Sequence, residues 1–261
     1  MNPMMTTLLD RRSVRAYQER PIPAAVREEI LRAVLRAPTA GNMMLYSVIE
    51  IAAQPLKERL AETCDHQPFI AAAPWVLLFL ADYQRWFDYF EHCGVPEYCA
   101  AKGQAMRRPA EGDLFLACCD ALIAAQTAVV AAESHGLGSC YIGDIMENYE
   151  IHRELLQLPQ YVFPITMVCF GYPTEQQRAR RQPPRFPMEA VVYRDGYRRL
   201  NGDDFAAMFR ETAEREFHNQ PFIGDTANIG QHMYVRKFNA GFMLEMNRSV
   251  RAILRAWREE E

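Results

Sequence analysis

One long apolar segment, residues 114–135, constrains the fold of this chain more than any other stretch. Its apolar side chains cover nearly the whole helical circumference, and only Asp120 and Gln126 interrupt them before the end. Gly136 follows directly, as is common at a helix C-terminus. A helix that is apolar on every side is buried at the centre of a fold or at a subunit interface. We therefore predict a central helix here.

Several other segments have recognisable periodicities. Residues 75–81 and 161–170 are continuous apolar runs, as expected of strands that are covered on both faces. Residues 45–52 are partly alternating and predict a strand, and residues 190–193 predict a short one. Residues 83–111 predict a helix with a lid-like loop. Further helices are expected at residues 23–36, 55–64, 149–156, 203–218 and 242–257.

The chain is long enough to bury a sizeable core as one domain. Its composition changes after residue 200, where two amphipathic segments are separated by a loop that contains Gly and Asn. We expect a main domain over residues 1–200. Residues 201–261 are then a helical extension that packs on this domain or on a dimer partner.

Charge and cysteine usage exclude some classes of function. The net charge of −4 argues against a general nucleic-acid or anionic-membrane binder. The apolar run over residues 70–81 is too short to span a bilayer, and Pro74 breaks it. The seven cysteines include no CxxC pair and indicate free thiols in a reducing compartment. These features predict a cytoplasmic protein without membrane or nucleic-acid partners.

A basic cluster near the N-terminus contrasts with the acidic chain. Arg11, Arg12 and Arg15 surround Ser13, and guanidinium forks with a hydroxyl are the groups that hold a phosphate. A solvated basic turn has the same spacing, so both interpretations stay open. Arg185 lies in a proline-rich loop, which either aims it at the same anion or is simply a surface loop.

Two further loops have small residues where a planar ligand fits. Residues 37–42, APTAGN, lie between a helix and a strand, although a plain helix-stop loop is the alternative. Residues 136–144, GLGSCYIGD, follow a helix and lack GxGxxG, so they are no dinucleotide-binding Rossmann loop. A tight turn around a buried strand is the alternative there. No metal site is predicted, because the spacing of Glu91, His92, Cys93 and Cys99 matches no zinc pattern.

In their order and spacing, these stretches resemble the FMN-dependent nitroreductases. The resemblance covers nearly the first two hundred residues and rests on RRSVRAY, APTAGN, AAPWVLLFL, GLGSCYIGD, FGYP and PPRFP. It implies an α+β fold, a nitroreductase-like sandwich with a central mixed, mainly antiparallel sheet flanked by helices. It also implies a homodimer in which the long helix builds the interface and both chains line each flavin pocket.

The resemblance further implies an FMN site. Arg11, Ser13 and Arg185 would hold the phosphate, Arg12 would lie beside it or the ribityl chain, and Arg15 would reach the pyrimidine edge. No side chain is expected to act as acid or base, because the chemistry takes place at flavin N5 and Arg15 has at most an electrostatic role. The other residues expected around the ring are Pro38, Thr39, Ala40 and Asn42 on one side, Tyr141, Ile142 and Gly143 near the reactive face, and Gln67 at an edge.

The implied activity is hydride transfer from NAD(P)H through FMN to a small-molecule acceptor of the nitroaromatic, quinone or flavin type, by a ping-pong mechanism. Two alternatives stay open. One is a specialised flavoenzyme, such as a reductive dehalogenase or a dehydrogenase. The other is a non-catalytic FMN-binding redox partner. No motif in the sequence encodes a preference for NADH or NADPH.

Overall fold

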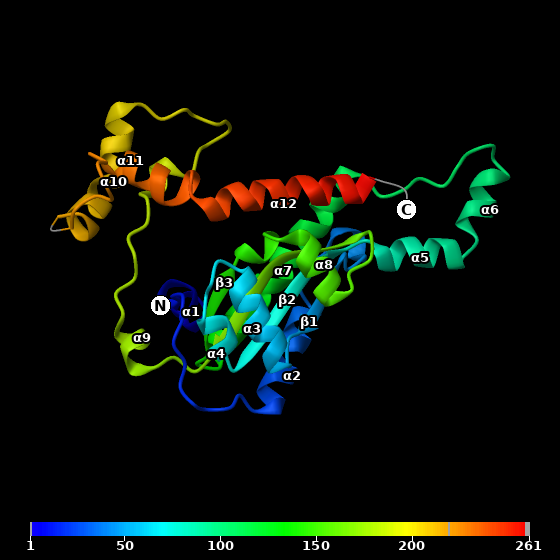
Figure 1. Cartoon of the computed structure of the whole chain (residues 1–261), viewed down its shortest axis with the longest axis horizontal. Helices are drawn as coiled ribbons and strands as arrows, with labels where there is room; N and C mark the ends of the chain where they lie inside the picture. Colours follow the sequence, from blue (N-terminus) through cyan, green and yellow to red (C-terminus); the bar gives the residue numbers. More distant parts are fainter. Residues whose placement is uncertain (1, 219, 259–261) are drawn as a thin grey trace. The chain divides into compact units, whose positions relative to one another are not determined.

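The computed structural model describes residues 2–218 and 220–258, which fall into two compact units (Figure 1). The first comprises Met1–Ala179 and Glu245–Glu261, and the second comprises Arg180–Leu244. The first unit contains the sheet and the central helix. The predicted division into residues 1–200 and 201–261 stays a prediction.

The first unit is built on a sheet of four strands in the order β1-β2-β4-β3. All three pairings are antiparallel, and an isolated parallel bridge from Ser13 to Ser139 makes the arrangement mixed at its β3 edge. The α+β fold class is therefore confirmed. The central strands β2 and β4 are buried at every position, which explains their continuous apolar sequence. The strands span Tyr46–Glu50 (β1), Trp75–Asp82 (β2), Gly138–Ile142 (β3) and Val162–Gly171 (β4).

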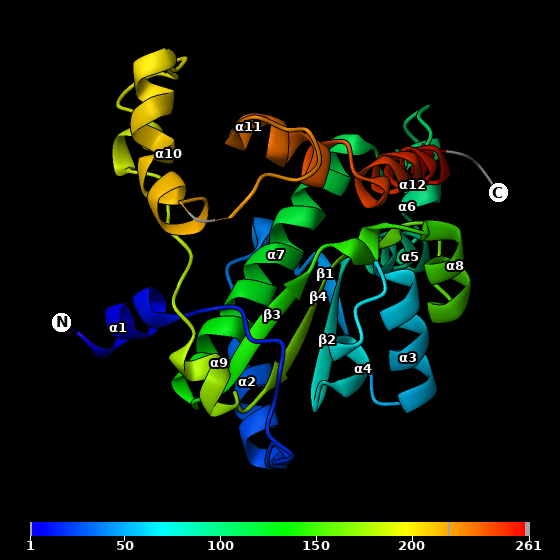
Figure 2. The ribbon, with the colours of Figure 1, turned by 60° about the vertical axis from the view of Figure 1, so that its left-hand side comes forward.

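Helices cover both faces of this sheet (Figure 2). Alternate side chains of β2 point to opposite faces, so Leu77 and Phe79 join one core cluster and Val76 and Leu78 join another. The first cluster lies under α7 and α2, and the second lies under α3 and α4 with the short helix η2. The bounds are Glu111–Ser134 (α7), Ala24–Val34 (α2), Gln54–Thr63 (α3), Phe69–Ala72 (α4) and Asp144–Met146 (η2).

Helix α7 confirms the predicted central helix and presents two different apolar faces. One face is rich in alanine and packs against all four strands of the sheet. Among the described residues, this is the one helix long and apolar enough to cross a membrane, but that face belongs to the core of the first unit. The other face stays exposed. Its large apolar side chains are Phe115, Leu116, Leu122 and Ile123, which recur at helical spacing.

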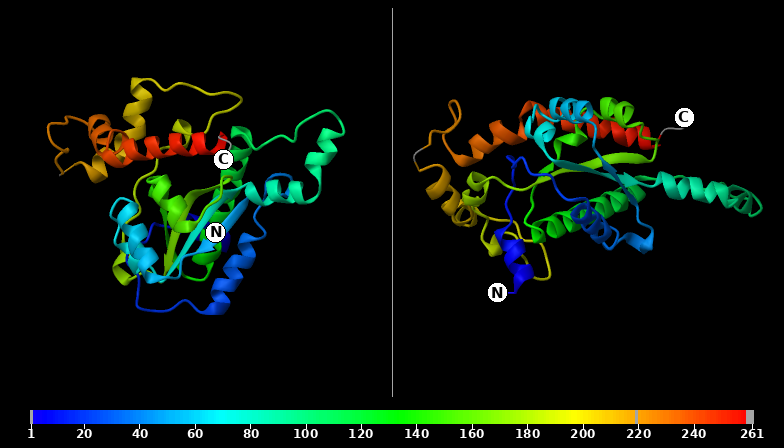
Figure 3. Two further views of the ribbon diagram at one scale, coloured as in Figure 1. Left: turned by 45° about the vertical axis from the view of Figure 1, so that its right-hand side comes forward. Right: turned by 90° about the horizontal axis from the view of Figure 1, so that it is seen from below.

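The remaining helices of the first unit surround this core. Two of them, α5 and α6, project away from the sheet, where a helix with a loop was predicted (Figure 3). In α12, Trp257 is buried and donates its indole N–H to the carbonyl of Ala110 at 3.1 Å. The bounds are Pro3–Asp10 (α1), Ala40–Asn42 (η1), Gln84–His92 (α5), Val95–Ala100 (α6), Tyr149–Leu156 (α8), Glu175–Ala179 (α9) and Gly241–Arg258 (α12).

The second unit is helical, and one prediction for it is wrong. Residues 190–193 form no strand, because the backbone N–H groups of Val191 and Val192 both turn back to the carbonyl of Met188. Both valines are exposed and no neighbouring strand pairs with them, so their β-propensity is overridden. The helices here are η3 (Met188–Ala190), α10 (Gly202–Glu216), α11 (Ile229–Met233), the π-helix η4 (Tyr234–Phe238) and the start of α12.

Candidate functional site

The arginine-rich segment is an extended arm fixed to the edge of the sheet. The backbone N–H of Val14 donates to the carbonyl of Ser139 on β3 at 2.9 Å. Further along, the N–H of Gln18 donates to the carbonyl of Tyr172, just after β4, at 2.8 Å. These bonds hold the arm at two points, so its arginines have defined positions beside β3.

Two glycines of the sheet allow the arm to approach this closely. A β-carbon on Gly138 would come within 2.4 Å of Val14 Cγ2, and one on Gly171 within 2.6 Å of Tyr17 Cδ1. Neither distance is tolerated, so any other residue at these positions would displace the arm. The Tyr17 hydroxyl donates to the carbonyl of Val14 at 2.8 Å, and burial raises the pKa of this phenol.

The arm borders a small cavity that is lined by both acidic and basic side chains. The Arg12 guanidinium donates to the carbonyl of Arg178 at 2.6 Å and lines a cavity of about 200 Å³ together with Glu133 and Gly138. Burial raises the pKa of Glu133 to about 7, and the charges of Arg11 and Arg12 oppose that shift. At neutral pH this carboxyl is therefore only partly ionised. Asp10 also lines the cavity, so acidic and basic groups meet there. Three arginines within five residues of the arm suit an anion such as a phosphate.

Arg15 lies further along the arm, at a different part of β3. Its guanidinium carbon is 5.8 Å from the centre of the Phe69 ring. Burial raises the pKa of the Cys140 thiol, and the charge of Arg15 opposes this shift more than any other group does. Arg15 thus lies between the 67–69 segment and β3, close to the predicted ring-edge residues.

At the end of β3, backbone groups are more available to a ligand than side chains are. Ile142 is 1% exposed and packs in the core, so only its backbone is available to a ligand. The Tyr141 hydroxyl donates to Gln126 Oε1 of α7 at 3.1 Å, and burial raises the pKa of Tyr141 to about 12. Apart from Gly143 itself and its two chain neighbours, no described residue has an atom within 4 Å of the place where a β-carbon on Gly143 would stand, so a flat group can approach there.

Gln67 lies at this same end of β3. Its amide nitrogen donates to Asp144 Oδ2 at 2.7 Å and to the carbonyl of Cys64 at 2.9 Å. Asp144 directly follows Gly143 in the chain. The structure therefore brings Gln67, Arg15 and residues 141–143 to the same end of β3. That they surround a flavin ring stays a prediction.

The loop of residues 38–42 is held by a residue whose role the sequence analysis missed. Asp120 of α7 is 2% exposed and accepts hydrogen bonds from the Thr39 hydroxyl, from the N–H of Ala40 at 3.0 Å and from the N–H of Leu45 at 3.1 Å. A buried carboxylate is stable when such donors surround it. The signal in the sequence was a lone acid within an apolar helix, which predicted only an interruption.

Within a single chain, the loop of residues 38–42 lies far from the arginine arm. The loop precedes β1 and the arm runs beside β3, and these strands are the two edges of the sheet, about 14 Å apart at the usual strand spacing. On α7, Asp120 holds the loop and Glu133 faces the arginines, about 20 Å further along the axis. Pro38 and Asn42 are exposed within the loop. Arg185 belongs to the second unit, so its place beside Arg11 stays a prediction.

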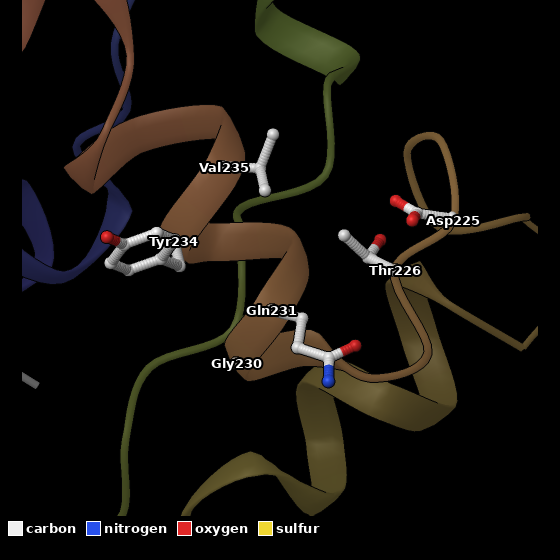
Figure 4. A pocket seen from close by; sticks show the side chains of 6 residues that line it. All are labelled: Asp225, Thr226, Gly230, Gln231, Tyr234 and Val235. Carbon is white, nitrogen blue, oxygen red and sulfur yellow. The ribbon is translucent and has the colours of Figure 1, made fainter.

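The second unit has hollows of its own, but the one in Figure 4 does not suit an anion. Its volume is about 470 Å³, and it lies against α11 and η4. The lining contains a carboxyl and no basic side chain, the residues being Asp225, Thr226, Gly230, Gln231, Tyr234 and Val235. Across residues 2–218 and 220–258, no three acidic, histidine or cysteine side chains are grouped so as to hold a metal ion.

Comparison with known proteins extends these observations. The sequence model of the Nitroreductase family matches residues 8–172. The FMN reductase (NAD(P)H) of Bacillus subtilis is 32% identical over 234 residues, which cover 88% of this chain and 89% of that protein. The oxygen-insensitive NADPH nitroreductase of Salmonella typhimurium is 31% identical over 214 residues, or 82% of each chain. The crystal structure of nitroreductase A from Vibrio parahaemolyticus has a TM-score of 0.79 at 25% identity and matches 97% of this chain and 98% of that one.

Proposed function

This chain belongs to the nitroreductase family, and from that premise we propose that it passes reducing equivalents from NAD(P)H to nitroaromatic, quinone or flavin-type acceptors in a ping-pong cycle. It is an FMN-dependent NAD(P)H oxidoreductase. The observation that carries the proposal is the arginine arm, which backbone hydrogen bonds fix beside β3 and which holds Arg11, Arg12, Ser13 and Arg15 within five residues.

The residues along the arm fit the phosphate of FMN. Arg11 and Ser13 would bind it, with Arg12 beside it, because a phosphate carries up to two negative charges that several guanidinium groups can compensate. The Oγ atom of Ser139, the β3 residue that pairs with Ser13 through a backbone bridge, is buried and has no hydrogen-bond partner among the described residues. Arg185 would add a further positive charge from the second unit.

The other predicted residues fit the ring system. FMN, when bound, supplies the centre that accepts and releases hydride. Gly143 leaves open space for a planar group. Gln67 would bind a ring edge, and the backbone of Tyr141 and Ile142 would contact the ring. The positive charge of Arg15 would stabilise negative charge on the ring, so that no dedicated acid or base is required of the protein.

Two features support a homodimer that shares each flavin site. The exposed apolar stripe of α7 around Phe115 and Leu122 costs free energy in water, and a second copy of this helix would cover it. The loop with Pro38, Thr39, Ala40 and Asn42 lies at the opposite edge of the sheet from the arm. In a dimer, the loop of one chain would complete the pocket formed by the arm of the other.

The cysteines support a reducing, cytoplasmic location. All seven are free thiols in the structure. Burial raises the pKa of Cys64, Cys140 and Cys169, which keeps these thiols protonated and unreactive. The structure thus gives them the properties of packing residues.

The ping-pong cycle is tested by initial rates with two varied substrates. NADH and NADPH are each varied at several fixed concentrations of menadione, a nitrobenzoate and free FMN. Parallel double-reciprocal lines are expected, because the nicotinamide leaves before the acceptor binds. Lines that intersect would show that both substrates bind together and would contradict the cycle. Turnover with none of the acceptors would instead favour an FMN-binding redox partner.

A further inference from the structure

A buried carboxyl near the end of β3 has no role in the function proposed above. Glu147 follows the short helix η2 and is 4% exposed, and its Oε1 atom has no hydrogen-bond partner among the described residues. Burying a carboxylate without a cation or hydrogen-bond donors is costly, so such a group holds a proton instead. Its position three residues after Asp144 places it beside the predicted ring edge.

The surroundings of Glu147 favour its protonated form. Burial and the nearby carboxyl of Asp144 raise the pKa of Glu147 to about 8, with Asp65 and Glu245 acting in the same direction. Asp144 lies in η2, Asp65 lies in the turn after α3, and Glu245 lies in α12. His152 of α8 supplies no cation, because burial lowers its pKa. At neutral pH Glu147 therefore keeps its proton and donates it in a hydrogen bond to the neighbouring Asp144 side chain.

His152 also has both ring nitrogens committed to other partners. Nδ1 lies 2.9 Å from the carbonyl oxygen of Ile145, and Nε2 lies 2.8 Å from the Thr63 hydroxyl. A neutral ring satisfies both contacts, donating to the carbonyl and accepting from the hydroxyl. The proton on Glu147 is therefore held between carboxyls rather than by the imidazole.

Asp144 connects this proton to Gln67. While it contacts Glu147, its Oδ2 atom accepts an N–H of the Gln67 amide at 2.7 Å. The other N–H of the same amide donates to the carbonyl of Cys64 at 2.9 Å. Both amide hydrogens are thus used within the protein. The carbonyl oxygen Oε1 is left as the part of Gln67 that is available to a ligand.

We propose that Glu147 is a positioning residue for the flavin. Through the hydrogen bond that it donates to Asp144, it fixes the Gln67 amide so that the carbonyl oxygen accepts an N–H of the bound ring. This inference rests on the proposed function, since Gln67 has this role only if FMN occupies the site. When Glu147 loses its proton, two neighbouring carboxylates repel, Asp144 moves, and the Gln67 amide loses the partner that orients it.

The test is a titration of the apoprotein with FMN, followed by quenching of flavin fluorescence, between about pH 6.5 and pH 9.5. Glu147→Gln keeps a neutral hydrogen-bond donor at every pH, and Glu154→Gln, an exposed position on α8, is the matched control. Near pH 6.5 all three proteins are expected to bind FMN equally. Near pH 9.5 the wild type and the control are expected to bind roughly three- to tenfold more weakly than Glu147→Gln, as for the loss of one hydrogen bond. Ionisation of FMN itself cancels in this ratio.

The same substitution made in a Gln67→Leu variant distinguishes positioning of the Gln67 amide from a purely structural effect of Glu147. In Gln67→Leu the amide is absent, so adding Glu147→Gln is expected to leave the affinity for FMN unchanged at every pH. An equal gain at high pH with and without Gln67 would overturn the proposal, as would identical pH profiles of the wild type and Glu147→Gln. If no variant and no wild type binds FMN, although thermal unfolding shows all of them folded, the proposed function itself is wrong.

Discussion

The carboxylate of Asp120 accepts the backbone N–H of Ala40 at 3.0 Å and so ties α7 to the loop before β1. The same carboxylate binds the Thr39 hydroxyl and the N–H of Leu45, so one buried side chain satisfies three donors. Its loss would release a loop that contains four predicted flavin-site residues. The stability of the fold and the shape of the site therefore depend on this single acid.

Asp120→Asn is expected to destabilise the protein by about 2–3 kcal/mol, because the amide places N–H groups where two or more donors require an acceptor. The affinity for FMN is expected to fall at the same time. Thermal unfolding and FMN titration measure the two effects. Thr39→Ser keeps the hydroxyl and serves as the control with little change. An unchanged melting temperature for Asp120→Asn would contradict the role of Asp120.

Arg11 is expected to recognise the phosphate and not the ring. Arg11→Gln should weaken FMN binding about tenfold to a hundredfold, as for the loss of a charge-assisted hydrogen bond. Binding of riboflavin, which lacks the phosphate, should hardly change. Arg32→Gln, on the surface of α2, is the control for a lost positive charge. Equal losses for FMN and riboflavin would place Arg11 away from the phosphate.

The exposed stripe of α7 gives a test of the dimer. Leu122 is 46% exposed on the face of the helix that does not pack on the sheet. Leu122→Glu would place a charge within the proposed interface, and we expect the dimer to dissociate at least about tenfold more readily. Sedimentation velocity measures this, with Ser134→Glu at the exposed end of the helix as control. FMN affinity should fall together with dimerisation, because both chains would line each pocket. A dimer that tolerates Leu122→Glu would exclude this face.

Glu147 also predicts how stability depends on pH. Its pKa rises from an ordinary 4.5 to about 8 in the folded chain, so between these values the folded state binds more protons than the unfolded state. This contribution to stability is complete below about pH 4.5 and is lost as the pH rises to about 8. Glu147→Gln removes it, and the variant should melt several degrees above the wild type near pH 9 but not near pH 5. Equal melting temperatures at both pH values would contradict a protonated Glu147.

Much of the fold follows from local patterns in the sequence. The strand β2 and the helix α7 were predicted from the lengths of their apolar runs, because a short run favours a buried strand and a long one favours a buried helix. The strand predicted at residues 190–193 was wrong because its valines lack a partner strand, and pairing depends on distant residues. The helix α1 was not predicted, and it has no buried residue.

Candidate site residues could be named from the sequence where a short segment gathers side chains that suit a ligand, as in the arginine arm. The role of Asp120 was not predicted, since its partners lie far away in the sequence. The role of Glu147 was not predicted either, since it depends above all on burial, which the neighbouring residues do not reveal. Asp120 bonds to a loop about eighty residues before it. The hydrophobic periodicity of a sequence indicates local structure and does not reveal such a distant contact. An acid within an apolar helix is the signal that points to one, and Asp120 has it.

The most direct test of the central claim is an absorption spectrum of the protein reconstituted with FMN, recorded without oxygen during addition of NADH and then NADPH. We expect a yellow protein whose flavin bands bleach fully and without a marked semiquinone, because hydride transfer moves two electrons together. A flavin that stays oxidised with both nicotinamides would contradict the proposed electron donor. A folded protein that takes up no FMN would contradict the phosphate site at Arg11, Arg12 and Ser13.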